Sequence, residues 1–230
     1  MRWPRVAKIS LTLTVLASIA IGAPVCIAWI RAELLRRDQA PSPVLATPQE
    51  TINILVAVFA QLEFIGVPPP PPEDGQSPPG EPVRTLILSD HSLCIDQTVR
   101  RSDCGIESSD LFTGPELDSL APRKFRQELV LANQESRPIN LAGIPNTRVV
   151  DSAEVNKILT EGWWKEFYLK FPGTSGYSQI GRPVLTPDRQ SALVYITLHC
   201  DGLCGAGVIY LLSHERTGWR VVKQETLWIS

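Results

Sequence analysis

The longest apolar run of the chain lies near its N-terminus. Residues 9–30, ISLTLTVLASIAIGAPVCIAWI, contain no charged side chain. As a helix they would extend roughly 30 Å, the thickness of a hydrocarbon core, and Trp3 and Trp29 stand near the two ends, where aromatic side chains favour the membrane interface. The pattern predicts a transmembrane signal anchor at 9–30. A cleaved signal peptide, with Ser18 and Ala20 before the cut, is the alternative.

Three later segments show apolar residues at the spacing of an amphipathic helix. TPQE, residues 47–50, has the pattern of a capping box and precedes an apolar stripe. A second helix is expected at about 122–134. A third begins at DSAE, residues 151–154, and is ended by the sequence Pro-Gly. Its expected apolar face comprises Val155, Ile158, Leu159, Trp163 and Phe167.

Beyond the third helix the pattern becomes that of strands separated by turns. The expected strands are YSQIGRPVL (177–185), SALVYITLHC (191–200), GVIYLLS (207–213) and WRVVKQETLWIS (219–230). Strands in succession with short turns are typical of an antiparallel meander, and preceding helices pack on the face of such a sheet. The sequence therefore predicts an α+β fold: an N-terminal transmembrane helix, then one domain with helices packed on a C-terminal antiparallel four-stranded meander.

These segments define the expected domain organisation. We expect a cytoplasmic N-terminus at 1–8, the anchor at 9–30, a tether at 31–46 and one extracytoplasmic domain at 47–230. A stretch within that domain, 67–83, contains eight prolines and is expected to be an extended connector. A further strand candidate, RTLILSD, follows it.

Charge is distributed unevenly along the chain. The 230 residues carry a formal net charge of −2, but residues 1–37 carry six Arg or Lys against one Glu, so the remainder carries −7. An acidic body lacks the basic footprint that nucleic acid requires. We therefore expect no nucleic-acid partner. The expected partners are the lipid bilayer, through 9–30, and a protein of the cell envelope.

Cysteine spacing bears on the cellular compartment. Cys26 lies inside the apolar run, which leaves two local pairs, Cys94 with Cys104 and Cys200 with Cys204. An even count after an export signal indicates two disulfides in an oxidising compartment. Four cysteines allow three connectivities, of which local pairing is the simplest. The pairs favour a bacterial cytoplasmic-membrane protein with its body outside the cytoplasm, or a secreted protein if the span is cleaved.

The segment HCDGLCGAG, residues 199–207, admits several interpretations. A strand is expected after it, so it lacks the helix N-terminus of a phosphate-binding loop, and CxxxC is not the CxxC redox spacing. A zinc site is one alternative. Its ligands would be His91, His199, Cys200 and Cys204. The favoured interpretation is a hairpin with a turn at 201–203, a cross-strand disulfide, and glycines that supply positive φ or a bulge. No metal or other cofactor is expected.

The C-terminal part of the chain also carries a resemblance. The segments WWKEFYLKFP, ALVYITLHCDGLCGAGVIYLL and GWRVVKQETLWIS resemble a group of secreted or membrane-anchored bacterial proteins without an assigned activity. In that group a helix with the pattern W-x-x-F-Y-x-x-[FY]-P precedes a C-G-x-L-C-G-x-G turn and a terminal G-x-W-x-V…W-x-S strand. Asp201 stands here where the group has glycine. The resemblance implies a fold and an exported location only.

The sequence indicates a class of function without naming a ligand. We expect a non-catalytic binding or structural domain of the envelope, with a contact surface that includes Trp164 and Tyr168. One alternative is an envelope hydrolase or metal-dependent enzyme that uses His91 and His199. Another is a small-molecule binding module with a pocket between the helix and the sheet.

Overall fold

A computed structural model describes most of the chain beyond its N-terminal segment. The described residues are 42–62, 85–96, 107–108, 112 and 114–230. The chain divides into two compact units, Met1–Ser42 and Pro43–Ser230, and the fold below is that of the second unit. The expected cytoplasmic N-terminus, the anchor at 9–30, the connector at 67–83 and Cys104 all lie outside the described residues.

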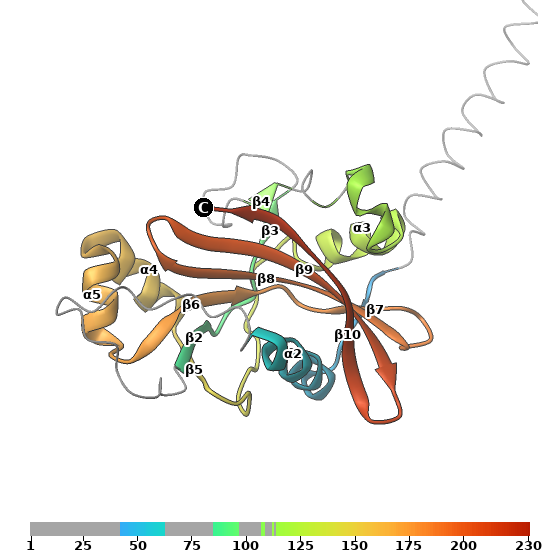
Figure 1. The fold of residues 1–230 in the computed structure, drawn as a ribbon, viewed down its shortest axis with the longest axis horizontal. Helices are drawn as coiled ribbons and strands as arrows, with labels where there is room; N and C mark the ends of the chain where they lie inside the picture. The colour runs from blue at the N-terminus through green and yellow to red at the C-terminus, as the bar shows by residue number, and fades with distance from the viewer. Residues whose placement is uncertain (1–41, 63–84, 97–106, 109–111, 113) are drawn as a thin grey trace, which may run out of the picture. The chain divides into compact units, whose positions relative to one another are not determined.

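The second unit contains one large sheet, one small sheet and several helices (Figure 1). The helices are α2 (Pro48–Leu62), the 3₁₀ helix η2 (Pro115–Ser119), α3 (Arg123–Ala132), α4 (Ser152–Glu161) and α5 (Trp163–Lys170). The large sheet comprises β1 (Val44–Leu45), β2 (Thr85–Ser89), β5 (Thr147–Val150), β6 (Thr174–Ile180), β7 (Val184–Leu185), β8 (Ser191–Asp201), β9 (Cys204–Glu215) and β10 (Gly218–Ile229). The small sheet pairs β3 (Ile95–Asp96) with β4 (Glu107–Ser108).

Strand β8 is the centre of the large sheet. On one side β9 and then β10 pair with it antiparallel. On its other side β6 and β7 lie one after the other along the same edge, both antiparallel to β8. Beyond β6 the direction changes, because β2 pairs parallel with β6 and β5 pairs parallel with β2. The sheet is therefore mixed.

The prediction of a four-stranded antiparallel meander is wrong. The four expected segments form only part of an eight-stranded mixed sheet. RTLILSD contributes β2, which enters between β5 and β6, and a parallel pair needs a crossover connection that leaves no signal in the local pattern. The segment YSQIGRPVL is divided into β6 and β7, and β1, within the expected tether, pairs with β7.

The transmembrane part of the predicted fold receives no support. No helix in the part of the chain that the structure describes is long and apolar enough to cross a membrane. The segment 9–30, on which that prediction fell, is not among these residues.

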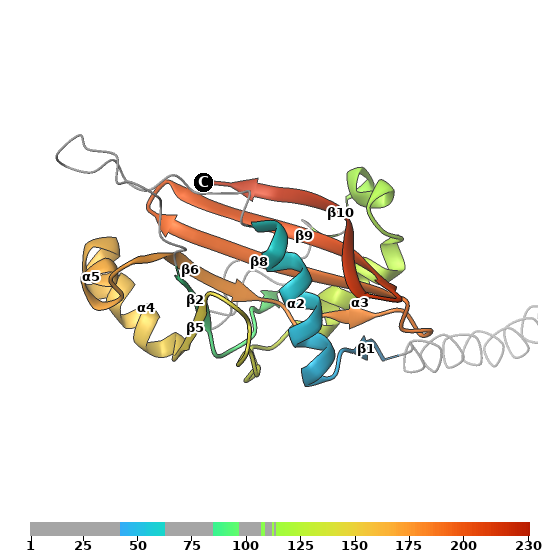
Figure 2. The same cartoon turned by 60° about the horizontal axis from the view of Figure 1, so that its bottom comes forward.

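One face of the sheet, the α2 face, is covered by α2 (Figure 2). The capping box predicted at its start is confirmed, because the Thr47 backbone N donates to Oε2 of Glu50 at 2.8 Å. Glu50 also accepts hydrogen bonds from Arg189, in the β7–β8 turn, and this contact is the main reason that the pKa of Glu50 falls to about 2. Ile54, Leu55 and Val58 of α2 are fully buried against the sheet.

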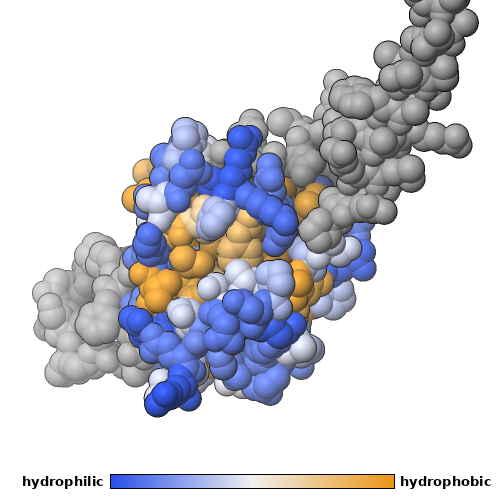
Figure 3. Space-filling view, turned by 90° about the vertical axis from the view of Figure 1, so that its right-hand side faces the viewer, coloured by the Kyte–Doolittle hydropathy of each residue, from blue (hydrophilic) through white to orange (hydrophobic). Residues whose placement is uncertain are grey.

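The opposite face, the α3 face, is covered in two places. At one end η2 and α3 pack on β7, β8 and β9, with Leu129 and Tyr195 in their shared core. At the other end α4 and α5 pack on β2, β5 and β6 around Phe167 and Tyr177. In Figure 1 these two helical groups stand at opposite ends of the sheet. Figure 3 shows the end with α3 and the β9–β10 turn, where hydrophobic residues are visible inside a polar rim.

Candidate functional site: the stapled hairpin tip

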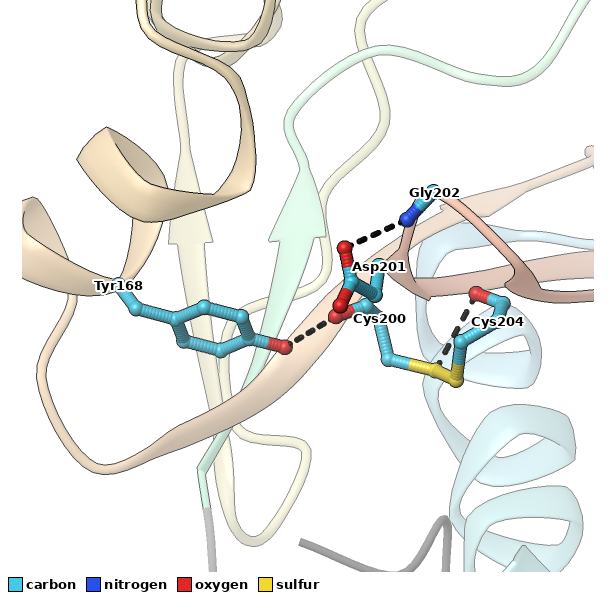
Figure 4. The surroundings of a disulfide bond; sticks show 5 residues. All are labelled: Tyr168, Cys200, Asp201, Gly202 and Cys204. Atoms are coloured by element: carbon cyan, nitrogen blue, oxygen red, sulfur yellow. Dashed lines mark hydrogen bonds between the residues drawn. A yellow bond between two sulfur atoms is a disulfide. The ribbon is translucent and has the colours of Figure 1, made fainter. Parts of the chain in front are cut away.

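The β8–β9 hairpin ends in a short, covalently closed turn. Asp201 pairs with Cys204, so only Gly202 and Leu203 form the turn. A disulfide joins Cys200 to Cys204, whose Cα atoms are 5.1 Å apart. The ladder shifts register between His199 and Asp201, which places a bulge at Cys200. The predicted cross-strand disulfide is therefore present (Figure 4), and so is the predicted bulge.

Cys94, in the other predicted pair, is also disulfide-bonded. Its expected partner, Cys104, lies outside the described residues, so that pairing stays a prediction.

The glycines of this segment do not serve the purpose that the sequence suggested. None of Gly202, Gly205 and Gly207 has a positive φ. Gly207 instead makes room for two neighbouring side chains. A Cβ there would lie 2.1 Å from Oη of Tyr195 and 2.2 Å from Nε1 of Trp228. Those two atoms form a hydrogen bond of 2.7 Å, in which Trp228 donates. Of the two alternatives predicted for the glycines, positive φ is absent from these three, and the bulge is present but lies at Cys200.

Helix α5 holds the hairpin from one side. The hydroxyl of Tyr168 donates a hydrogen bond of 2.6 Å to the carbonyl oxygen of Cys200 (Figure 4). Within the turn, Oδ1 of Asp201 accepts from the backbone N of Gly202 at 2.6 Å. The disulfide and the Asp201 hydrogen bond hold the turn itself, and the Tyr168 hydrogen bond fixes it with respect to the helix.

Trp163 is the residue that departs most from expectation. The predicted single helix breaks into α4 and α5 at Gly162, and Trp163 adopts φ 59°, a left-handed conformation that is uncommon for a bulky residue. Its side chain is 61% exposed, whereas the next residue, Trp164, is 7% exposed and packs against Phe167. The break shifts the helical phase, so Trp163 leaves the predicted apolar face and Trp164 enters it.

The exposed indole of Trp163 lies beside the hairpin turn. A Cβ on Gly202 would lie 3.0 Å from Cζ2 of Trp163. Leu203, the other turn residue, is 91% exposed. We call Trp163, Gly202 and Leu203, together with the Cys200–Cys204 disulfide, the stapled tip. It presents an aromatic ring and an aliphatic side chain on a covalently closed loop.

The two residues predicted as a contact surface, Trp164 and Tyr168, are not part of the stapled tip. Trp164 is buried in the core under α5. Tyr168 is half-buried, and its hydroxyl is engaged by the hairpin. Sequence reasoning therefore missed Trp163 and Leu203. The available signal was Gly162, since a glycine inside a helical pattern disfavours continuation of the helix.

The structure does not bring His91 and His199 together. His199 pairs with Tyr177, which is in register with Ile87 of β2. His91 lies beyond the end of β2, and β2 itself is two strands, about 10 Å, away from β8 across the sheet. Among the described residues no group of three or more His, Cys, Asp or Glu side chains could hold a metal ion, and Cys200 and Cys204 are bonded to each other.

His91 has a local partner instead. Its Nδ1 lies 2.8 Å from Oδ1 of Asp90, and the same carboxylate oxygen accepts from the backbone N of Ser152, at the start of α4, at 2.9 Å. Burial raises the pKa of Asp90, but the hydrogen bonds from His91 and Ser152 together lower it by more. The pKa therefore lies below its ordinary value. Burial lowers the pKa of His199. The Asp90–His91 pair thus joins β2 to α4.

In comparisons with family models, with curated proteins and with solved structures, nothing matches this chain.

Proposed function

We propose that the chain is a non-catalytic binding protein that acts outside the cytoplasm and contacts a protein partner through the stapled tip. The observation that carries the proposal is the exposure of Leu203 and Trp163, 91% and 61%, on a turn closed by a disulfide. Trp anchors are enriched among the residues that dominate binding energy at protein interfaces. A rigid loop loses little conformational entropy when it binds, so its contacts are more effective.

Backbone strain at Trp163 is a second support. A left-handed conformation at a residue with a side chain costs about 1–2 kcal/mol, and such outliers cluster at functional sites. In this chain the strained residue is an exposed tryptophan rather than a glycine. The conformation keeps the indole beside Gly202, outside the core that Trp164 fills.

The proposed location rests on the cysteines. A disulfide at Cys200–Cys204, together with a disulfide-bonded Cys94, favours an oxidising compartment, because cytosolic thiols are kept reduced. An exported protein of the cell envelope accords with this chemistry.

The test is site-specific photocrosslinking in the cells that make the protein. A photoreactive amino acid replaces Leu203 in the full chain, and the matched control carries it at Arg216, in the turn of the β9–β10 hairpin. We expect a discrete covalent adduct with one protein from position 203, and none from position 216. Adding Trp163→Ala to the first variant should reduce the adduct several-fold.

Equal adducts from positions 203 and 216, or none from either, would contradict the proposal. An adduct that survives Trp163→Ala unchanged would remove Trp163 from the contact. The disulfide content of each variant, measured by intact mass, establishes that the hairpin is closed in every case.

A further inference from the structure

Strand β10 forms one border of the large sheet (Figure 2). It pairs with β9 on one side, and no described strand pairs with its other side. The β9–β10 ladder shifts register on either side of residues 223–226, which form the regular stretch between two irregularities. An edge strand presents a row of backbone N–H and C=O groups with which a further strand can pair. Within the part of the chain that the structure describes, residues 223–226 therefore offer a free backbone edge.

The side chains of this stretch are open to solvent and include two opposite charges. Residues 222–226 are all exposed, on both faces of the sheet. Lys223 and Glu225 are in register with β9 residues that pack into the core on the α3 face. The two charges therefore lie on the α3 face, two residues apart along the strand. Gln224, between them, is in register with a residue of the core on the α2 face.

The order of the charges matches that of a second copy of the same strand. When two copies of β10 pair antiparallel about a two-fold axis at Gln224, Lys223 of each copy lies opposite Glu225 of the other, on the same face. Opposite charges at directly opposed positions stabilise antiparallel strands, and like charges destabilise them. An axis at Lys223 or at Glu225 would place like charges opposite each other. The charges therefore favour the register about Gln224.

The same features restrict which strand β10 accepts. Charged side chains and bulges on an edge strand discourage pairing with unrelated strands, and only a strand with the complementary order of charges satisfies both Lys223 and Glu225. Nζ of Lys223 already donates a hydrogen bond to the carbonyl oxygen of Ser119 in η2. An ammonium group has three donors, so this contact leaves Lys223 able to bind a carboxylate of a second copy as well.

We propose that the chain forms a dimer through antiparallel pairing of β10 with β10 of a second copy, with the two-fold axis at Gln224. The pairing joins the two large sheets into one continuous sheet. By symmetry the dimer carries two stapled tips, so it would bind a partner that offers two contact positions with increased avidity. The dimer does not depend on the protein contact proposed at the tip, and either proposal can fail without the other.

The test is disulfide crosslinking between copies of the full chain. Gln224→Cys places a thiol at the two-fold axis, where the Cα atoms of opposed residues lie about 4.5–5.5 Å apart, within the range for a disulfide. The protein is incubated with a mild oxidant at about 200 µM, since a short contact between two surfaces gives a weak complex. We expect a disulfide-linked dimer on a non-reducing gel, above the background that the chain's own cysteines give without the substitution.

Thr226→Cys is the matched control. Thr226 is exposed like Gln224, and both are in register with residues of the core on the α2 face. In the proposed dimer, however, the two copies of Thr226 are four residues, ~13 Å, apart along the strands, so this variant should give no dimer above background. Because both positions are exposed, neither substitution disturbs the core.

Charge reversal tests the register of the pairing. In the Gln224→Cys chain, Lys223→Glu should lower the initial rate of crosslinking about tenfold, because two attractive pairs become repulsive. Adding Glu225→Lys makes both pairs attractive again and should restore the rate. This restoration cannot come from Ser119, because its hydrogen bond with Lys223 is absent from both variants.

Three results would overturn the proposal. The first is crosslinking of Thr226→Cys as fast as that of Gln224→Cys. The second is no crosslinking of Gln224→Cys above background, which is the result expected if a segment of the same chain or an unrelated protein occupies this edge. The third is a doubly reversed variant that crosslinks no faster than Lys223→Glu alone.

Discussion

The two C-terminal hairpins share strand β9 but end in opposite ways. The β9–β10 turn is polar and is supported by an exposed ion pair, Glu215 with Arg220 at 2.6 Å, and by a ring contact between His214 and Trp219. The β8–β9 turn exposes a leucine and is closed by a disulfide. An ordinary surface turn has the first composition. Covalent closure and apolar exposure at the other tip, on the same sheet, are the features on which the proposed protein contact rests.

The largest expected difference between the hairpins concerns a glycine of β6 that contacts the first hairpin and a glycine within the second. Gly176 of β6 has φ 139°, and a Cβ there would lie 2.3 Å from the carbonyl oxygen of His199, the residue before Cys200 of the staple. Gly218, in the second hairpin, has φ 122° and open space around it. Gly176→Ala should lower the free energy of unfolding by about 3–5 kcal/mol, through overlap and backbone strain. Gly218→Ala should lower it by about 1–2 kcal/mol, through strain alone.

Urea unfolding of both variants measures these free energies. Equal losses of unfolding free energy would mean that a small backbone shift relieves the overlap between β6 and His199. The close contact of β6 with the stapled hairpin would then contribute nothing to stability.

The staple itself should have the next largest effect. The bond closes a loop with a sequence separation of 4, for which the loop-entropy relation gives about 2 kcal/mol. The double variant Cys200→Ser and Cys204→Ser should lose that amount in urea unfolding. In the second hairpin Arg220→Ala removes an exposed ion pair and should cost about 0.5 kcal/mol or less. A smaller loss for the double variant than for Arg220→Ala would contradict the larger contribution to stability that we expect from the disulfide.

The smallest effect concerns pH and His199. Burial lowers its pKa in the folded chain, so below about pH 6.5 the unfolded chain takes up a proton more readily than the folded one. Stability should therefore be complete above pH 6.5 and fall as the pH decreases, by at most about 1.4 kcal/mol per pH unit from this group. His199→Gln should flatten the profile between pH 6.5 and 5. His214→Gln, in the second hairpin, serves as the control, and an equal flattening by that change would assign the slope elsewhere.

Local signals in the sequence predicted local structure well. The Thr47–Glu50 capping box is present, and Asp151 caps α4 by accepting from the backbone N of Ala153 at 2.8 Å. The CxxxC spacing correctly predicted a disulfide across a hairpin. Each of these features depends on residues within a few positions of one another, where side-chain chemistry and backbone geometry are directly linked.

Features that depend on distant segments escaped prediction. The position of β2 between β5 and β6 is set by partners about 60 and 90 residues away along the chain. The spacing of Trp163 predicts a buried position because it fits an unbroken helix, but the break at Gly162 changes the helical phase.

The bulge at Cys200 has a consequence for how the chain acquires its strand register. A slip of one residue in β8 against β9 would move every side chain of one strand to the opposite face. Two cysteines can be joined only when their Cα atoms lie within about 7 Å and their side chains point toward each other. Oxidation of Cys200 and Cys204 therefore selects hairpins that have already formed the bulge and the correct alignment. The bond then keeps β8 and β9 in the correct register. Strand β10 therefore pairs with a strand whose register is already fixed.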